Sequence, residues 1–161
     1  FDYDKVIFAT HADDTLKLIK DPTENEKNIL GNFKYKQNIA CLHCDDQLMP
    51  SRVNTWSSWN SILDKNDPNK NCVTYWLNKL QNLKTENNYF LTLNPIFPVN
   101  SKKMIKEVKF SHPFYDLQTL KSQKDLGKLQ GKNNTWFCGS YFGYGFHEDG
   151  IKSSLDIINK I

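Results

Sequence analysis

The stretch Thr135–Ser154, TWFCGSYFGYGFHEDGIKSS, decides the fold prediction, because it joins an apolar strand, a glycine-rich loop and a helix start. The run Trp136-Phe137-Cys138 predicts a short buried strand. The pair Gly150-Ile151 predicts the start of a helix, whose apolar positions Leu155, Ile158 and Ile161 recur at helical spacing. A strand, a loop and a helix in this order are typical of an α/β layer.

The loop between this strand and helix has the composition of a ligand site. Gly139, Gly143 and Gly145 allow the backbone to turn and to approach another group closely. The free N–H groups and the dipole of a following helix attract electron-rich groups, so the loop predicts a site for a phosphate or a carbonyl-rich ring. The alternative is an ordinary connection between a strand and a terminal helix.

Composition narrows the class of protein. The chain has 161 residues, and 21 Lys and Arg against 18 Asp and Glu give a net charge of +3 without a basic cluster, which excludes nucleic acid as an expected partner. No apolar run approaches the roughly 18–20 residues of a transmembrane helix. The chain starts at Phe1 without a Met or a targeting signal, so we expect a segment of a longer cytoplasmic polypeptide.

The four cysteines allow a metal interpretation. Cys41-Leu42-His43-Cys44 invites a zinc or redox site, but residues three apart in a strand point to opposite faces. Cys72 and Cys138 have no paired spacing, and no two of the four histidines do either. We therefore expect reduced structural cysteines and no metal site, with zinc at Cys41 and Cys44 as the alternative.

The first 32 residues predict a strand followed by two helices. Lys5–Ala9 is a continuous apolar run of strand length, typical of a buried parallel strand, and a helix follows from Asp13-Asp14. Asp21-Pro22 predicts the N-cap and first residue of a second helix, about 22–30, with Gly31 just past its end.

Residues 33–115 predict an antiparallel β-rich domain, because strand-like stretches alternate with turn residues. His112-Pro113 is expected to end the last strand, since proline cannot donate to a ladder. The predicted strands are Tyr35–Cys44, Thr55–Ile62, Cys72–Leu77, Tyr89–Leu93 and Ile105–Phe110.

Residues 116–161 return to the α/β pattern, with Asp116 capping a helix over about 117–130 before the strand at Trp136. The predicted fold class is therefore α/β (α+β): one layer at both ends of the chain, interrupted by a mostly antiparallel β-sheet domain. This organisation predicts that the first and last strands are neighbours.

An ordered set of motifs resembles flavin-containing amine oxidase-like proteins, in the bacterial branch usually described as predicted NAD/FAD-binding proteins. The resemblance covers nearly the whole chain. It is carried by Asp4–Asp13, Leu42–Asp45, Leu48–Pro50, Trp56–Asn60, Tyr75–Gln81, Thr92–Pro95, Trp136–Gly139 and Gly145–Ile151.

The resemblance implies the C-terminal half of an FAD-dependent oxidoreductase, inactive alone. Residues 1–32 and 116–161 would belong to a Rossmann-type FAD-binding domain, and residues 33–115 to the substrate domain. The G-x-G-x-x-G turn that binds the FAD pyrophosphate is absent, so the N-terminal half of the same polypeptide is the implied partner.

The resemblance also implies site residues. His147 would be catalytic, with a capping or loop histidine as the alternative. The cofactor-binding positions would be Ala9, Thr10, Gly139, Ser140, Glu148, Asp149, Gly150 and Ile151, although the two acids also fit a helix start without a further role. The substrate-side positions would be Trp59, Asn60, Trp76, Asn78, Asn94 and Phe146, with core or cross-strand packing as the alternative for the tryptophans.

The leading hypothesis is hydride transfer from a substrate C–H to the flavin. The substrate would be a small molecule, either an amine or a lipid-like chain undergoing desaturation. The alternative, from a different class of protein, is a non-catalytic binding or interaction module that keeps an oxidase-like scaffold.

Overall fold

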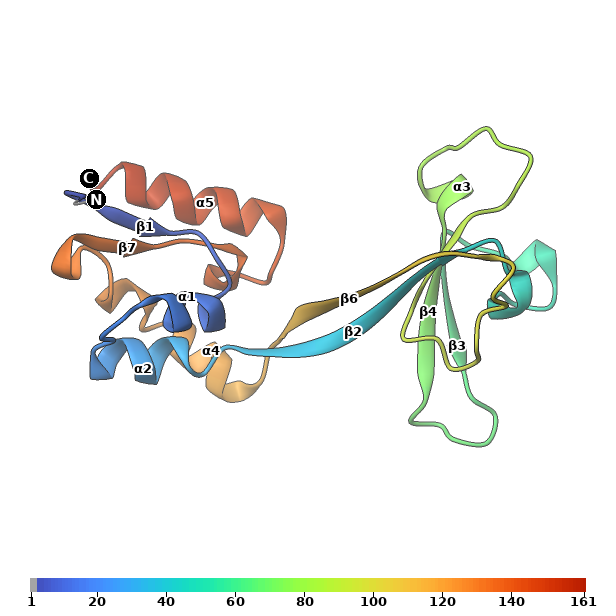
Figure 1. The fold of residues 1–161 in the computed structure, drawn as a ribbon, viewed down its shortest axis with the longest axis horizontal. Coiled ribbons are helices and arrows are strands. Elements are labelled where there is room, and N and C mark those ends of the chain that lie inside the picture. Colours follow the sequence, from blue (N-terminus) through green and yellow to red (C-terminus); the bar gives the residue numbers. More distant parts are fainter. Residues whose placement is uncertain (1–2) are drawn as a thin grey trace. The chain divides into compact units, whose positions relative to one another are not determined.

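A computed structural model describes residues 3–161 and divides the chain into two compact units (Figure 1). The terminal unit combines Phe1–Lys36 with His112–Ile161, and the inserted unit is Gln37–Ser111. Phe1 and Asp2 lie outside the described residues. The assignments of these segments to FAD binding and to substrate binding stay predictions.

The terminal unit is built on two parallel strands, β1 (Val6–Phe8) and β7 (Thr135–Phe137). Val6 pairs with Thr135 and Phe8 with Phe137, and the prediction that the first and last strands are neighbours is confirmed. The helices of this unit are α1 (Ala12–Leu18), α2 (Glu24–Leu30), α4 (Leu117–Gln123) and α5 (His147–Ile158).

Helices cover both faces of this strand pair (Figure 1). On the face toward α1 and α2, Phe137 is buried and stacks on Phe8, with ring centroids 5.7 Å apart. On the opposite face, Trp136 and Cys138 pack with Ile157 of α5. The alternation of side chains along β7 therefore supplies the cores of both layers.

The inserted unit is a mostly antiparallel sheet of five strands in the order β3-β4-β5-β2-β6. Its connections include a short helix, α3 (Leu77–Leu80). The strands are β2 (Lys34–His43), β3 (Trp59–Leu63), β4 (Asn71–Trp76), β5 (Phe90–Leu93) and β6 (Met104–Phe114), and β2 and β6 continue into the terminal unit.

A chain of buried polar side chains crosses this sheet. Thr74 of β4 and Thr92 of β5 share a hydrogen bond of 2.8 Å between their hydroxyls, and His43 Nε2 lies 2.8 Å from Thr92 Oγ1. The backbone N–H of Asp45 donates to His43 Nδ1 at 3.1 Å, which places the imidazole proton on Nε2. All four side chains are fully buried or nearly so, and the hydrogen bonds offset the cost of burying them.

Several predicted boundaries are wrong for identifiable reasons. The second helix begins at Glu24, because Thr23 and Glu26 form a reciprocal capping box. Trp56 is not in a strand: β3 begins at Trp59, after a turn that a hydrogen bond from Trp56 Nε1 to the carbonyl of Pro50 holds. The fourth helix, α4, ends at Gln123 and a 3₁₀ turn follows.

Two predicted strands also differ from the structure. Strand β6 continues through Pro113 to Phe114, and it can do so because an edge strand needs no N–H on its outer side. Strand β1 is parallel as predicted but not buried, since Val6 and Ile7 keep 39% and 46% of their surface exposed. Among the described residues β1 pairs only with β7, so the other edge of this apolar run has no neighbouring strand.

The buried His43 makes stability depend on pH. Burial lowers the pKa of His43 below its ordinary value of 6.5, so the unfolded chain binds a proton that the folded chain excludes. We expect the contribution of His43 to the free energy of unfolding to be constant above about pH 7 and to fall progressively as the pH drops below about 6.5. Urea unfolding monitored by tryptophan fluorescence checks this.

The variant His43→Gln is the control, because an amide can hydrogen-bond at this position but does not titrate. It should be less stable at neutral pH and should lose most of the slope between about pH 6.5 and pH 5. An equal slope in both proteins would show that His43 is not the source of the pH dependence.

Candidate functional site

The cofactor-binding positions predicted on the two parallel strands come together at one edge of the pair. Ala9-Thr10 follows β1 and Gly139-Ser140 follows β7, and the N–H of Cys138 donates to the carbonyl of Phe8 at 2.9 Å. Ligands of α/β folds bind at the carboxyl edge of parallel strands, and this is such an edge.

Gly139 is required where these two loops meet. Its φ of 151° lies in a region that favours glycine. A Cβ at this position would lie 2.7 Å from the ring of Tyr141 and 3.6 Å from the carbonyl oxygen of Thr10. The two loops are therefore in close contact, and only a backbone without a side chain fits between Thr10 and Tyr141.

Ser153 ties the last helix to this edge. Its hydroxyl accepts a hydrogen bond from the N–H of Gly139 at 3.0 Å and lies 2.8 Å from the carbonyl of Gly150, to which it donates. Ser153 is buried, so these bonds form in a medium of low polarity. They hold the helix beside the end of β7.

The helix begins at His147, and the prediction that it begins at Gly150-Ile151 is wrong. The N–H of Gly150 already donates to the carbonyl of Phe146 at 3.3 Å, so it is not a free first-turn donor. The free N–H groups at the start of the helix are those of His147 and Glu148. Ile151 lies in the second turn and keeps 57% of its surface exposed.

Asp149 closes the loop back onto the helix. Its Oδ2 accepts hydrogen bonds of 3.0 Å from the N–H groups of both Tyr144 and Phe146. Its carboxylate also occupies the space in which a side chain of residue 143 would stand, so Gly143 is required by close approach. Gln123 Nε2 fixes the other side of the loop by donating to the carbonyls of Tyr141 and Gly143.

Two phenols without hydrogen-bond partners border the loop. Within residues 3–161, the hydroxyls of Tyr115 and Tyr141 are buried and have no partner. Burial raises the pKa of both phenols, and the nearby Asp149 carboxylate adds to the effect at Tyr115. Both groups therefore stay protonated, and neither hydroxyl oxygen is accessible to solvent. Sequence periodicity gave no signal for either residue.

The side chains predicted at the helix start face solvent. Phe146 and His147 are exposed, and Glu148 forms an exposed ion pair of 3.6 Å with Lys152. Asp149 lines a cavity of about 160 Å³, which is smaller than the roughly 300 Å³ at which ligand pockets begin. A cavity of about 590 Å³ lies between α2 and α4, and none of the predicted site residues lines it.

In the inserted unit, the predicted asparagines hold the backbone. Asn60 Oδ1 accepts from the N–H of Ser57, and Asn78 Oδ1 accepts from the N–H of Tyr89. Asn94 has a left-handed φ of 50° and accepts from the N–H of Ile39. These bonds account for the polar residues within strand-like patterns.

The predicted substrate-side tryptophans also make structural contacts. Trp76 Nε1 donates to Asn88 Oδ1 at 3.0 Å, and the ring of Trp59 packs edge-on against Tyr75. Trp59 nevertheless keeps 64% of its surface exposed. A role toward substrate stays a prediction for these residues and for Phe146.

All four cysteines are free thiols. Cys41 is buried in β2, and both ring nitrogens of its neighbour His43 are engaged in hydrogen bonds. Burial raises the pKa of Cys41 and Cys72, which disfavours the thiolate form that binds metal. Within residues 3–161, no cysteine belongs to a group of possible metal ligands.

No protein-family model matches the sequence, and no curated protein matches it. Among solved structures, the fold is similar to that of a CLA-producing fatty acid isomerase from P. acnes, with a TM-score of 0.63 and 13% sequence identity. The match covers 98% of this chain and 41% of that chain. This chain is thus similar in fold to part of an enzyme and spans less than half of its length. The resemblance to amine oxidase-like proteins stays a prediction.

Across residues 3–161, the structure contains no helix with the length and apolar character needed to cross a membrane.

The close approach of Gly143 to Asp149 gives a stability test. We expect Gly143→Ala to lower the free energy of unfolding by about 1–3 kcal/mol, because the added Cβ displaces the carboxylate and breaks its two hydrogen bonds to backbone N–H groups, each worth about 0.5–1.5 kcal/mol. Gly127→Ala is the matched control, since nothing lies within 4 Å of its Cβ position. Urea unfolding measures both variants, and equal values would contradict this account of the loop.

Proposed function

We propose that this chain forms part of an FAD-dependent oxidoreductase in which hydride passes from a substrate C–H to the flavin. The supporting observation is the convergence of Thr10, Gly139 and the start of α5 at the carboxyl edge of β1 and β7. Rossmann-type layers bind dinucleotides at such an edge. The convergence of these residues therefore supports a Rossmann-type layer as part of the proposal.

The start of α5 is the feature of this edge that suits a flavin, because the first turn of the helix has free N–H groups. FAD, when bound, supplies the hydride acceptor. The helix N-terminus would stabilise the negative charge that develops on the reduced ring, and Phe146 and His147 would lie toward the substrate.

A lipid-like substrate is favoured over an amine. The fold similarity to a fatty acid isomerase supports a scaffold for an apolar chain. The motif resemblance supports the amine, which is the second choice. The lipid proposal requires no negatively charged side chain as a partner for the substrate, whereas a protonated amine would require one.

The N-terminal half of the same polypeptide is the proposed partner. Val6 and Ile7 of β1 are exposed, and the outer face of α5 exposes Ile151, Leu155 and Ile158. Further strands and a covering helix would bury these apolar groups, each stabilising the assembly by about 1 kcal/mol, because roughly half of each side chain is already buried. This surface is compatible with a larger α/β layer.

The first test is cofactor uptake by the longer polypeptide, purified with and without added FAD. We expect flavin absorbance at one FAD per chain, and consumption of an unsaturated fatty acid but not of a primary amine. The proposal fails if the longer polypeptide takes up no FAD on reconstitution, and the choice of substrate fails if only the amine is consumed.

The second test concerns the helix N-terminus. In the FAD-loaded longer polypeptide, Glu148→Gln removes a negative charge from the first turn of α5, and we expect the flavin midpoint potential to rise by about 10–20 mV. Glu24→Gln is the matched control, because Glu24 also lies in the first turn of a helix and pairs with a lysine, Lys27. Equal flavin midpoint potentials in the two variants would show that the start of α5 does not act on the flavin.

A non-catalytic binding module is the second candidate function. It is favoured by the exposure of His147 and by the small cavity at Asp149, which does not enclose a substrate. FAD uptake without turnover of either substrate would support this candidate over the enzyme.

A further inference from the structure

The sheet of the inserted unit buries a mostly polar row of side chains on one face. Across β3, β4, β5 and β2, this row consists of Asn60, Thr74, Thr92 and Cys41. All four residues are buried, and Trp56 helps to cover their face by packing edge-on against Phe90, with ring centroids 5.6 Å apart. The polar side of the sheet is therefore its inner face.

The opposite face of the same strands, the outer face, is apolar and uncovered. Its central row across β3, β4, β5 and β2 consists of Trp59, Tyr75, Leu91 and Leu42, flanked by Val73 and Leu93. Trp59 keeps 64% of its surface exposed, and the other five side chains are partly exposed. A sheet with one covered face normally turns its apolar residues inward, so this inverted pattern marks a binding surface.

Strand β6, which neighbours β2, adds a cation to the outer face. Gln37 Nε2 donates to Ser111 Oγ at 2.6 Å, and burial together with the Glu107 carboxylate raises the pKa of the Cys41 thiol. Both contacts join odd-numbered residues of the two strands, so the even-numbered residues share the opposite face. Lys106 therefore lies on the outer face, at the β6 side of the apolar row.

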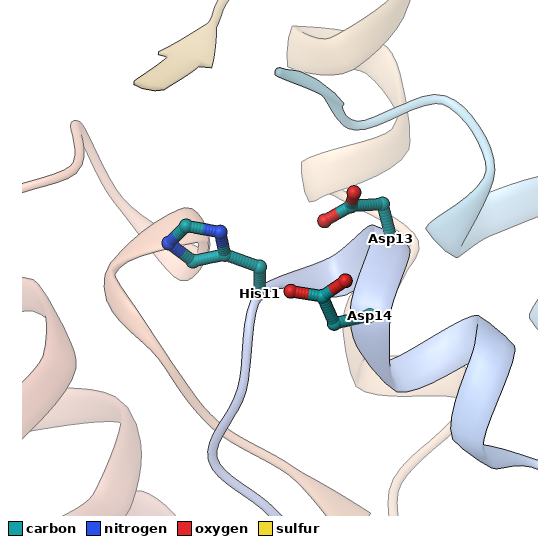
Figure 2. Close-up of side chains that lie close together, drawn as sticks. All are labelled: His11, Asp13 and Asp14. Atoms are coloured by element: carbon teal, nitrogen blue, oxygen red, sulfur yellow. The ribbon is translucent and has the colours of Figure 1, made fainter. Parts of the chain in front are cut away.

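Lys106 differs from the paired lysines of this chain. At the start of α1, for comparison, Lys17 Nζ lies 3.2 Å from Asp13 Oδ2 and 2.9 Å from Asp14 Oδ1, and Figure 2 shows these two carboxylates beside His11. Among the described residues, no carboxylate pairs with the exposed Lys106. It is also the only charged side chain on the outer face within the strands of the inserted unit, all of which are described.

We propose that the outer face binds a long-chain fatty acid, with its carboxylate at Lys106 and its acyl chain across the central apolar row toward Trp59. The ligand complements the face, because it carries one negative charge at the end of an apolar chain. The lengths also agree. Five strands about 4.8 Å apart span about 19 Å, and an acyl chain fills about half of the roughly 30 Å hydrocarbon core of a bilayer. The inference rests on the proposed function, whose lipid-like substrate it assigns to a surface.

The first test is the binding of brominated stearate to the chain without FAD, below the critical micelle concentration, since bromine quenches the fluorescence of a nearby tryptophan. We expect saturable quenching that is stronger with bromine near the methyl end than near the carboxylate, because Trp59 and Lys106 lie on opposite edges of the sheet. Trp59→Phe should remove most of this difference between the two probes.

The variant Lys106→Gln tests the contact with the carboxylate. We expect its Kd for the fatty acid to rise about three-fold and its Kd for the uncharged methyl ester to stay unchanged. Lys109→Gln is the matched control, because Lys109 is an exposed lysine of the same strand on the opposite face, and its Kd should not change. Leu91→Asn should raise the Kd of both ligands about ten-fold.

Several results would overturn the inference. These are no saturable quenching, stronger quenching by bromine near the carboxylate, equal affinity for the acid and its methyl ester, or the same Kd in the two lysine variants. Circular dichroism checks that each variant is folded. If Leu91→Asn does not fold, the comparison of Lys106→Gln with Lys109→Gln decides the question, because both side chains are exposed.

Other occupants of the outer face give different results, each of which would also overturn the inference. Quenching only when vesicles are present would assign the face to a membrane, and a Trp59-dependent dimer without fatty acid binding would assign it to a second copy. Binding that is lost in the longer polypeptide would assign it to the N-terminal half. Failure of the proposed function is seen separately, because FAD uptake by the longer polypeptide is measured without fatty acid.

Discussion

The parallel pairing of β1 with β7 is the constraint on which the terminal unit depends. The pairing joins segments separated by more than a hundred residues, and it aligns Thr10 with Gly139 at one edge. Each strand has only three residues, so the ladder itself contributes little. The helices on both faces, packed through Phe137 on one side and Trp136 on the other, stabilise the pair.

The glycine loop is rigid because two side chains satisfy its backbone. Asp149 accepts from its N–H groups, and Gln123 donates to its carbonyls. The exposed aromatic rings of Tyr144 and Phe146 are therefore held on a fixed backbone rather than on a mobile one. A loop of this kind can present a binding surface at a low entropic cost.

Periodicity in the sequence predicted the architecture better than the boundaries. The apolar run at Lys5–Ala9 and the stretch at Trp136 were sufficient for a shared layer, because continuous apolar strands are typical of parallel pairing. The start of α5 was missed because Phe146 is an unusual N-cap residue, and the signal was instead Asp149 three positions later. Pro113 suggested a strand end, since the sequence did not reveal that β6 lies at a sheet edge.

The sequence predicted only the part of the candidate site that depends on backbone geometry. Glycine spacing indicated Gly139, whereas Tyr115 and Tyr141 became visible only when folding left their hydroxyls without partners. Asn60, Asn78 and Asn94 stood out as polar residues in strands, and their backbone hydrogen bonds explain their presence.

The division of the chain has a consequence for synthesis on the ribosome. The inserted unit is one continuous segment, Gln37–Ser111, so all of its contacts are available before the last fifty residues are made. The terminal unit must wait until β7 emerges to pair with β1, since its two segments lie on either side of the insertion. During synthesis the inserted unit can therefore fold while β1 still lacks β7, and its early folding shortens the loop that the pairing of β1 with β7 must close.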